Sequence, residues 1–376
     1  MKPIINYNKN EIKYRGEEST LFQAISPAFY IIRVFGLGPY HFSGDRLVPS
    51  NVHLIFSIIG LLFNSYVSIG VLIRFSIKGN QPILGVTEQL KVIMNYGTSI
   101  VNIIVAMCTR ERIVQVWTMI QDFDYDTSIL GFPQMENGTK FRTWCIIFIN
   151  TILWVWINQA GMLAFFETWL QNVSYLMLYI ATCVSVYKYA GLVIIIGSRF
   201  KHLNKIAKIC SPNENGWHHL PKIESKVIEK LHENLMTASR NLDSAYSWPL
   251  LFWLFNLCSH TVSNTYFIIT AFMDHDFDII IQICLAGWFI IYVMQLIVLH
   301  VACDFTSNEA NRLGDILLNW RKWQVFNDDA KFESTLYLLN YKLNFSAAGC
   351  CYVNLLLLRS ITGILCTYLI ILLQLP

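Results

Sequence analysis

The chain is short of charged residues. Only 14% of its 376 residues are Asp, Glu, Lys or Arg, whereas about a quarter are charged in typical soluble domains. Hydrophobic residues make up 54% of the chain. The scarcity of charge excludes an ordinary soluble domain, and the net charge of +3 is too small to indicate a nucleic-acid partner. We therefore expect a protein that crosses a membrane several times.

Two further absences restrict the function. The first 20 residues are polar and charged and contain no apolar core of a cleavable signal peptide, so we expect the N-terminus to remain in the cytosol. The ten cysteines lie mostly in apolar runs and show none of the paired spacings of zinc or redox sites. We interpret them as small core residues and expect no metal and no cofactor.

Long apolar runs are what the sequence does contain. They predict an all-α polytopic membrane fold with seven transmembrane helices, at approximately 51–73, 84–108, 144–166, 175–197, 247–272, 279–301 and 350–375. Leu21–Gly38 is also apolar, but Pro27, Gly36 and Arg33 interrupt it. We interpret this stretch as an interfacial or re-entrant element.

Lysine and arginine are distributed unevenly between the two sides of the predicted membrane. With the N-terminus inside, the cytosolic segments contain 23 of the 28 basic residues, and the outer segments contain only Arg74 and Lys78. This distribution follows the positive-inside rule. Seven spans then place the C-terminus outside the cell, which is the reverse of a G-protein-coupled receptor.

The predicted topology separates three Asn-X-Ser/Thr glycosylation motifs. Asn137 and Asn344 fall on the cytosolic side, where no glycosylation occurs. Asn172 lies in the short outer loop between the third and fourth spans. Only Asn172 is therefore a candidate acceptor.

Two cytosolic stretches have the pattern of amphipathic helices. In Lys222–Asp243, apolar residues recur at spacings of three and four, namely at Ile223, Val227, Ile228, Leu231 and Leu235. A similar stripe follows the sixth span, at Ala310, Leu313, Ile316, Leu317 and Trp320. We expect helical extensions whose apolar faces pack either on the same subunit or on a neighbouring subunit.

The last span reads Thr367-Tyr368, five apolar residues, then Gln374 and Leu375. This ending resembles the insect gustatory receptor family, whose last span carries Thr-Tyr, five apolar residues and Gln-Phe. Supporting likenesses are Phe345–Gly349, Leu231–Leu235 and the stretch from Ala302 to Ala310. The resemblance covers the C-terminal third well, and the rest of the chain in span order, inverted topology and length.

The resemblance implies a ligand-gated, non-selective cation channel for taste detection in the cell membrane of a sensory neuron. It would be a homotetramer or a heteromer with other gustatory receptors, and its partners would be a small-molecule tastant, permeant cations and the lipid bilayer. The implied parts are a cytosolic N-terminal segment at 1–50, a ligand-binding bundle at 51–301, a cytosolic anchor segment at 302–349 and a pore-lining helix at 350–376.

The last span itself contains residues suited to a pore. On a helix, the candidates lie on or beside one face; they are Ile364, Thr367, Tyr368, Ile371, Gln374 and Leu375. Four copies would form a hydrophobic ring that gates by dewetting, next to an amide ring that can hydrate a cation. No acidic residue lies in this span, so we expect a poorly selective cation pore. Gln374 also fits an ordinary interfacial amide at a helix end.

Aromatic and polar residues in spans two to six, and at their outer ends, are the candidates for ligand contacts, because a small-molecule site in a helical bundle combines such groups. They are Lys91, Asn95, Trp154, Trp156, Asn158, Gln159, Tyr175, Tyr179, His260, Asn264, Tyr266, Gln282 and Trp288. Each also fits an interhelical hydrogen bond or a packing role. Lys91 requires a partner or a water-filled cavity, and Glu88, three residues earlier, is a candidate ion-pair partner.

Three alternatives remain open. A sugar-sensing gustatory receptor and an insect odorant receptor would share the topology and pore. A polytopic membrane enzyme is the alternative of a different class, but His300 and Asp304 fit a hydrogen-bonded pair at a helix end, with no third metal ligand at helical spacing. The candidate ligand residues are rich in aromatics and poor in carboxylates. We therefore favour a bitter or deterrent plant compound over a sugar, and expect no enzymatic activity.

Overall fold

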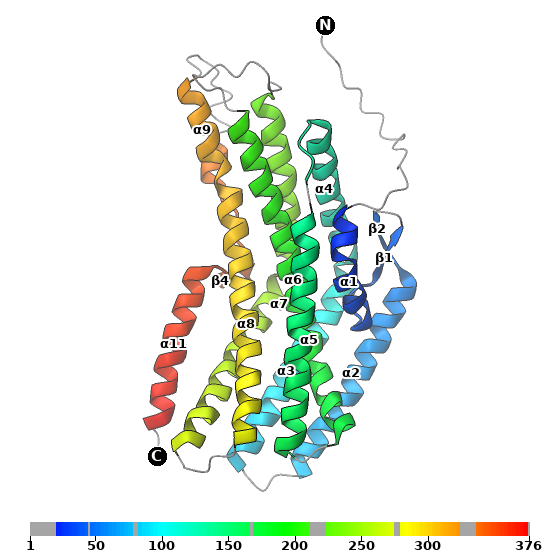
Figure 1. The fold of residues 1–376 in the computed structure, drawn as a ribbon, viewed down its shortest axis with the longest axis vertical. Coiled ribbons are helices and arrows are strands. Elements are labelled where there is room, and N and C mark those ends of the chain that lie inside the picture. The colour runs from blue at the N-terminus through cyan, green and yellow to red at the C-terminus, as the bar shows by residue number, and fades with distance from the viewer. Residues whose placement is uncertain are drawn as a thin grey trace.

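Helices make up most of the chain, as the apolar runs predict. In this computed structural model the described residues are 20–43, 46–77, 82–134, 136–165, 168–210, 223–273, 279–323 and 336–374. In chain order the helices are α1 (Thr20–Val34), α2 (Asn51–Ile77), α3 (Pro82–Cys108), α4 (Arg110–Ile129), α5 (Asn137–Phe165), α6 (Trp169–Ile209), α7 (Ser225–Met273), α8 (Ile279–Asn311), α9 (Leu313–Trp323) and α11 (Leu355–Gln374). Figure 1 shows that most of them run along one long axis.

Within the described residues, five helical stretches are long and apolar enough to cross a membrane by length and composition. They are Asn51–Ile73, Gln89–Cys108, Gly138–Ala164, Leu176–Ile209 and Ile279–Trp320. The expected span at 247–272 lies within α7, and the apolar part of α11, Leu355–Ile371, is shorter. The count of seven spans therefore stays a prediction. The last helix begins at Leu355 rather than at 350, because a short strand and a helix cap precede it.

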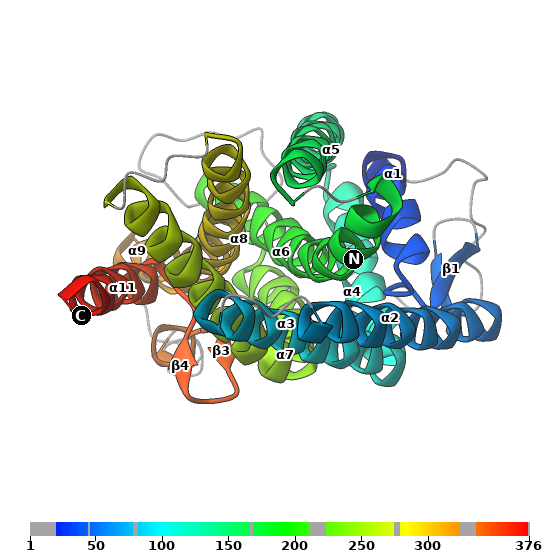
Figure 2. The ribbon, with the colours of Figure 1, turned by 90° about the horizontal axis from the view of Figure 1, so that it is seen from below.

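α6 forms the centre of the bundle, as the end-on view in Figure 2 shows. It contacts α1 to α5 on the one hand and α7 to α9 on the other. A close crossing with α8 occurs at Gly197, where an added Cβ atom would collide with Thr306 Oγ1 and come within 2.8 Å of the Phe305 ring. Thr306 donates its hydroxyl hydrogen to the Val193 carbonyl at 2.8 Å. The absence of a side chain at Gly197 therefore sets the distance between the two helices.

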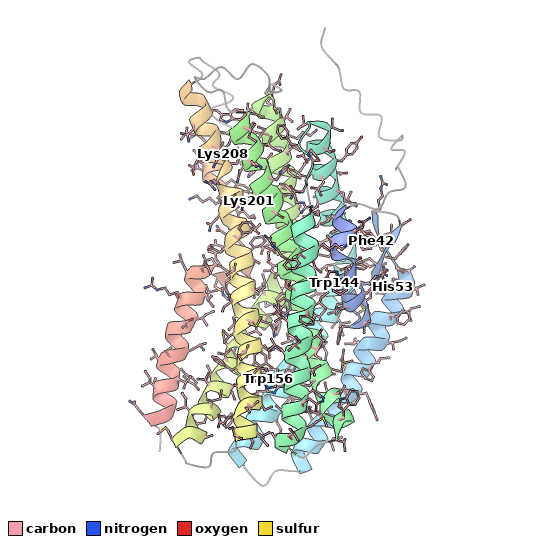
Figure 3. All side chains as sticks on the ribbon, in the orientation of Figure 1. Phe42, His53, Trp144, Trp156, Lys201 and Lys208 are labelled. Atoms are coloured by element: carbon pink, nitrogen blue, oxygen red, sulfur yellow. The ribbon has the colours of Figure 1, made fainter. Side chains whose placement is uncertain are left out.

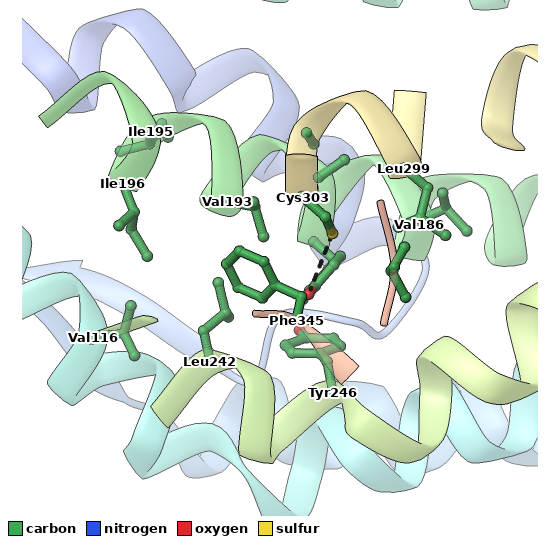
Figure 4. Close-up of a cluster of buried hydrophobic side chains, with 14 of the residues drawn as sticks. Val116, Val186, Val193, Ile195, Ile196, Leu242, Tyr246, Leu299, Cys303 and Phe345 are labelled. Carbon is green, nitrogen blue, oxygen red and sulfur yellow. Dashed lines mark hydrogen bonds between the residues drawn. The ribbon is translucent and has the colours of Figure 1, made fainter. Parts of the chain in front are cut away.

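Aromatic and small apolar side chains fill the core between α6, α7 and α8 (Figure 4). The Tyr189 hydroxyl lies 3.9 Å from Cys303 Sγ, and the Tyr189 ring lies 5.0 Å from Tyr246 and 6.4 Å from Phe345. Phe345 is buried in this core and precedes α11. The core thus ties the approach to the last helix to α6 and α7.

The prediction that the cysteines are core residues is correct for some of them. Cys183, Cys284 and Cys303 are buried, whereas Cys108, Cys350 and Cys366 are exposed in the single chain. The exposed ones lie at the end of α3, just before β4 and on α11.

Both predicted amphipathic stripes are confirmed as helices with buried faces. The first is the start of α7, where Ile228, Leu231 and Leu235 are buried and only Val227 is exposed. The second lies on α8 and α9, and all five of its residues are buried. Both stripes therefore pack within the same chain.

Other elements differ from the expectation. Two antiparallel ladders interrupt the all-α fold: β1 (Tyr40–Ser43) pairs with β2 (Arg46–Pro49), and β3 (Ser346–Ala347) pairs with β4 (Cys351–Tyr352). The first ladder follows α1, which ends at a left-handed turn at Gly36, with φ +71°. The connection after the second span forms α4, a helix that the charged sequence did not suggest.

Candidate ligand-binding site

Five aromatic rings from four helices meet inside the bundle, and we call them the ring cluster. Trp288 and Tyr292 on α8 stack 5.8 Å apart, and His260 on α7 stacks on Tyr292 at 4.4 Å. Tyr179 on α6 meets Trp288 and His260 edge to face, at 4.8 and 5.5 Å. Trp154 on α5 meets Trp288 in the same way at 5.6 Å. These are favoured geometries for ring pairs, and four of the five rings are residues that the sequence analysis selected.

Lys91 on α3 is buried and reaches across to α7. Its Nζ donates to Asn264 Oδ1 at 3.3 Å and lies 5.3 Å from the centre of the Phe267 ring. An ammonium group inside an apolar bundle requires such partners. The side chain of Glu88, the candidate ion-pair partner, lies outside the described residues.

Two further polar pairs join α3 to α7 in line with Lys91. Asn256 Nδ2 donates to Asn95 Oδ1 at 3.3 Å, and Trp253 Nε1 donates to Asn102 Oδ1 at 2.9 Å. Lys91, Asn95 and Asn102 are four and seven residues apart, so they lie on one face of α3. The three pairs form a polar row beside the ring cluster, because His260 belongs to the same stretch of α7.

Several buried polar atoms of this region have no hydrogen-bond partner among the described residues. They lie on α3, α7 and α8: Asn95 Nδ2, Ser99 Oγ, Asn102 Nδ2, Asn256 Oδ1, His260 Nε2, Ser263 Oγ, Asn264 Nδ2 and both polar side-chain atoms of Gln282. An unpaired buried donor or acceptor costs about 1–3 kcal/mol. Such a concentration indicates groups placed to hydrogen-bond something other than the chain itself.

Asn172, the predicted glycosylation acceptor, is buried in the first turn of α6 and does not lie in the expected loop. Its Nδ2 donates to the backbone oxygen of Asn158 at 2.8 Å and to Asn158 Oδ1 at 3.1 Å. Gly161 makes room for this contact, since a Cβ atom there would lie 3.1 Å from Asn172 Nδ2. A glycan would replace one of the two Nδ2 hydrogens and would therefore disrupt this buried contact. Asn158 thus links α5 to α6, and glycosylation of Asn172 stays a prediction.

The other selected residues lie outside the ring cluster. Trp156 is partly buried and packs against Ala160, Ala164 and Cys284, as Trp288 of the ring cluster also does. Gln159 is exposed, and Tyr266 is partly buried with its ring 5.6 Å from Phe267. The side chain of Tyr175 lies outside the described residues.

Four residues of this region were not predicted from the sequence, namely Tyr292, Asn256, Asn102 and Trp253. A usable signal existed for two of them, because Tyr292 follows Trp288 by four residues and Asn256 precedes His260 by four. The pairing of Asn102 with Trp253 joins positions 151 residues apart, and no local pattern reveals it.

α11 carries the predicted pore residues and stands at one edge of the bundle, mainly against α7 and α8 (Figures 1 and 2). Ile364 is 67% exposed, and Tyr368 and Ile371 are each 50% exposed. Thr367 and Gln374 are exposed as well, and Leu375 lies outside the described residues. An apolar helix exposed to this extent needs lipid or further protein around it.

The first turn of α11 is held by hydrogen bonds to its backbone. Asp304 Oδ1 on α8 accepts from the Leu355 N–H at 3.3 Å, and Asn354 Oδ1 accepts from the Leu357 N–H at 2.9 Å. A carboxylate at a helix N-terminus also interacts favourably with the helix dipole. α8 therefore both contributes rings to the ring cluster and fixes the start of α11.

α7 holds the same region through Asp243. Its Oδ1 accepts from the Ser346 N–H at 2.9 Å. Burial raises the pKa of the Asp243 carboxyl, and the bonds from Ser346 partly oppose that shift. The segment before α11 is therefore fastened to α7 and α8, two of the four helices that carry the ring cluster.

The expected pair of His300 and Asp304 does not form. His300 Nδ1 bonds to the Leu296 carbonyl of its own helix at 2.7 Å, while Asp304 accepts from Leu355 and from Asn308. Among the residues described, no group of three or more His, Cys, Asp or Glu side chains could hold a metal ion.

A bundle with several apolar helices long enough to span a bilayer is that of a multi-pass membrane protein. Residues 25–375 match the profile of a family described as 7tm Chemosensory receptor. This match spans almost the whole chain, and the protein belongs to that family, whose members are receptors and not enzymes. A comparison with curated proteins gives no match.

Two solved structures share the fold. The insect olfactory receptor OR5 from Machilis hrabei is similar with a TM-score of 0.70 and 14% sequence identity, over 94% of this chain and 98% of that one. The same receptor in complex with eugenol gives a TM-score of 0.68 and 13% identity, over 93% and 97% of the two chains.

Proposed function

We propose that this chain is a subunit of a ligand-gated, non-selective cation channel that detects taste compounds. The observation that carries the proposal is the ring cluster with the unpaired polar atoms beside it. Aromatic faces with a few convergent hydrogen-bonding groups are typical of small-molecule sites. The proposed site takes its residues from α3, α5, α6, α7 and α8.

The proposed orientation has the N-terminus in the cytosol and the C-terminus outside, with α7 and α11 completing seven spans. The basic residues of the loops support it. In Figure 3, Lys201 and Lys208 lie towards the end of the bundle that would be cytosolic, and Trp156 lies towards the other end. The cell membrane of a sensory neuron is the proposed location.

In the proposed assembly, four copies of α11 surround a central pore, with the segment 302–349 as an anchor on the cytosolic side. The exposure of Ile364, Tyr368 and Ile371 in one chain supports this role. Apolar rings of this kind gate by dewetting, and Gln374 supplies an amide ring. The other subunits are either copies of this chain or other gustatory receptors.

The proposed ligand is a bitter or deterrent plant compound. The ring cluster and the polar row contain aromatics, amides and the single ammonium of Lys91, with no carboxylate among their named residues. A sugar site would usually combine aromatic faces with several acidic or amide groups, and of these two kinds only amides are present among the named residues. An odorant receptor is the second candidate, because the olfactory receptor OR5 shares the fold and has been captured with eugenol.

Whole-cell current recorded from cells that express this chain tests the proposal. Plant alkaloids and glycosides, sugars and small phenols such as eugenol would be applied without added G protein. We expect a cation current with the first group. A current evoked only by volatile phenols would favour the odorant alternative, and a current evoked only by sugars would favour the sugar alternative. A response that requires G protein would overturn the channel proposal.

Two variants with a matched control locate the site. Trp288→Ala removes the ring that contacts Trp154, Tyr179 and Tyr292, and we expect the half-maximal ligand concentration to rise about tenfold or more. Trp144→Ala removes an exposed ring of α5, 52% exposed, and should leave the response unchanged. Gln374→Ala should alter conductance or ion selectivity without moving the half-maximal concentration. Equal effects of Trp288→Ala and Trp144→Ala would refute the site.

A further inference from the structure

A cavity lies along α5 and α6, and we call it the α5–α6 groove. Its volume is about 630 Å³, within the range of about 300–1,000 Å³ that small-molecule sites occupy. α1, the β1–β2 hairpin and α4 form the rest of its wall, and most lining side chains are apolar. Trp154 lies between the two sites, since it lines the groove and contacts Trp288.

Lys188 on α6 lines this groove and is 8% exposed. Its Nζ donates to the Leu37 carbonyl at 2.8 Å and lies 5.3 Å and 5.8 Å from the ring centres of Tyr40 and Tyr246. Among the described residues no carboxylate pairs with it. A buried ammonium without a counter-charge is costly in an apolar setting, so this group is placed to meet an anion from outside the chain.

Arg142, near the start of α5, supplies a second cation to the groove. No acidic residue lines the groove within the described part of the chain. α5 and α6 are adjacent antiparallel helices, and Asn150 on α5 contacts Cys183 on α6 at 3.7 Å. Arg142 precedes Asn150 and Lys188 follows Cys183, so both cations lie towards the end of the groove where α5 begins. The cationic end is therefore distinct from the other end, where Trp169 lies.

The rest of the groove suits an acyl chain. The α5 wall from Arg142 to Gln159 extends about 25 Å at 1.5 Å per residue, and it is lined by apolar residues such as Ile146, Ile147 and Val155. In the proposed orientation the cationic end lies in the cytosolic half of the membrane, with Arg142 next to the inner end of the third predicted span. Basic pockets between transmembrane helices on that side are suited to anionic lipid head groups.

We propose that the α5–α6 groove binds an anionic phospholipid of the inner leaflet, with its phosphate held by Lys188 and Arg142 and one acyl chain lying along α5 and α6. The inference rests on the proposed orientation but not on the identity of the tastant. Lipid retention and ligand-evoked current are separate measurements, so either proposal can fail while the other holds.

The test is native mass spectrometry of the full chain purified in detergent and equilibrated with equal amounts of phosphatidylglycerol and phosphatidylcholine. We expect the wild type to retain phosphatidylglycerol preferentially. Lys188→Met and Arg142→Gln should each lower that preference about fivefold, the usual contribution of one basic residue. Lys201→Met, which removes an exposed lysine of the same helix, is the matched control and should have no effect.

A steric variant tests the position of the acyl chain. Gly191 lines the groove, and an added Cβ atom would meet nothing within 4 Å, so Gly191→Phe should fill the groove without disturbing the core. The Gly191→Phe variant should retain less of both phosphatidylglycerol and phosphatidylcholine than the wild type. Gly70→Phe changes an equally open position on α2 and is the control, so it should retain both lipids as the wild type does.

Three results would overturn the proposal: equal retention of the two lipids by the wild type, a preference that survives Arg142→Gln, or unchanged retention in Gly191→Phe. Arg142 is exposed, so its replacement should not prevent folding even if Lys188→Met does. Retention of a sterol, or of oleate in place of phosphatidylglycerol, would also overturn the assignment to a phospholipid.

Discussion

Arg199 on α6 holds Asp124 on α4 through two parallel hydrogen bonds, from Nε to Oδ1 at 3.1 Å and from Nη2 to Oδ2 at 2.8 Å. The arginine is completely buried and forms a second ion pair with Glu136, just before α5. The planar guanidinium matches a carboxylate in this two-pronged geometry. One side chain thereby fixes α4, the start of α5 and α6 together.

Removing Arg199 should destabilise the fold strongly. Arg199→Met leaves Asp124 and Glu136 close together without their cation, and loss of one partner from a buried pair costs about 3–5 kcal/mol. Asp124→Asn keeps an acceptor for the arginine and should cost less. Melting temperatures of the purified protein check this order, and equal melting of Arg199→Met and the wild type would show that the ion pairs are dispensable.

Gly197 and Gly191 form a matched pair of positions on α6. Gly197→Ala forces a Cβ atom against Thr306 and Phe305, and overpacking of this kind costs about 1–3 kcal/mol. Gly191→Ala meets no atom within 4 Å and gains the better helix propensity of alanine, up to about 1 kcal/mol. We expect the first variant to melt below the wild type and the second at or above it. The opposite order would contradict the close crossing of α6 and α8.

His232, in the first part of α7, should make stability depend on pH. It is buried, and its Nε2 bonds to the Ala310 carbonyl at 2.9 Å. Desolvation by burial lowers the pKa of His232 to about 4, although the bond to Ala310 acts in the opposite direction. Between this value and the unfolded value of about 6.5, the unfolded chain binds a proton that the folded chain does not. Stability should therefore fall as pH drops through this window, by up to about 3 kcal/mol.

Melting curves of the wild type and His232→Gln at neutral pH and near pH 4.5 measure this dependence. The variant lacks the titrating group, so its melting temperature should change less with pH. An identical pH response in both proteins would mean that other groups cause the acid sensitivity.

Asp304 should couple α8 to the start of α11. Asp304→Ala removes the acceptor of the Leu355 N–H, and loss of a helix cap costs about 1 kcal/mol. Asp304→Asn keeps an acceptor but loses the charge, and should have a smaller effect. We expect reduced ligand-evoked current in Asp304→Ala at normal surface expression. Full current in Asp304→Ala would show that Asn354 alone is a sufficient cap.

Much of the candidate site could be selected from the sequence, but its arrangement could not. Trp154, Tyr179, His260 and Trp288 were chosen as aromatics in apolar spans, and the structure brings them together. Tyr292 was missed although its spacing from Trp288 is helical, and Gln159 was chosen although it is exposed on α5. Residue type and depth are properties of the sequence, whereas the direction of a side chain depends on how each helix is rotated in the bundle.

Most helices and their apolar faces could be predicted from the chain alone, because these follow from local spacing and from the length that a bilayer requires. The stripes on α7, α8 and α9 were predicted in this way and are buried. The tertiary structure decided which helices meet. Arg199 reads in the sequence as one more basic residue beside a membrane span, and only the fold places it against Asp124, 75 positions earlier. The α5–α6 groove and the isolation of Lys188 have the same origin, since contacts between distant positions leave no periodic trace in the chain.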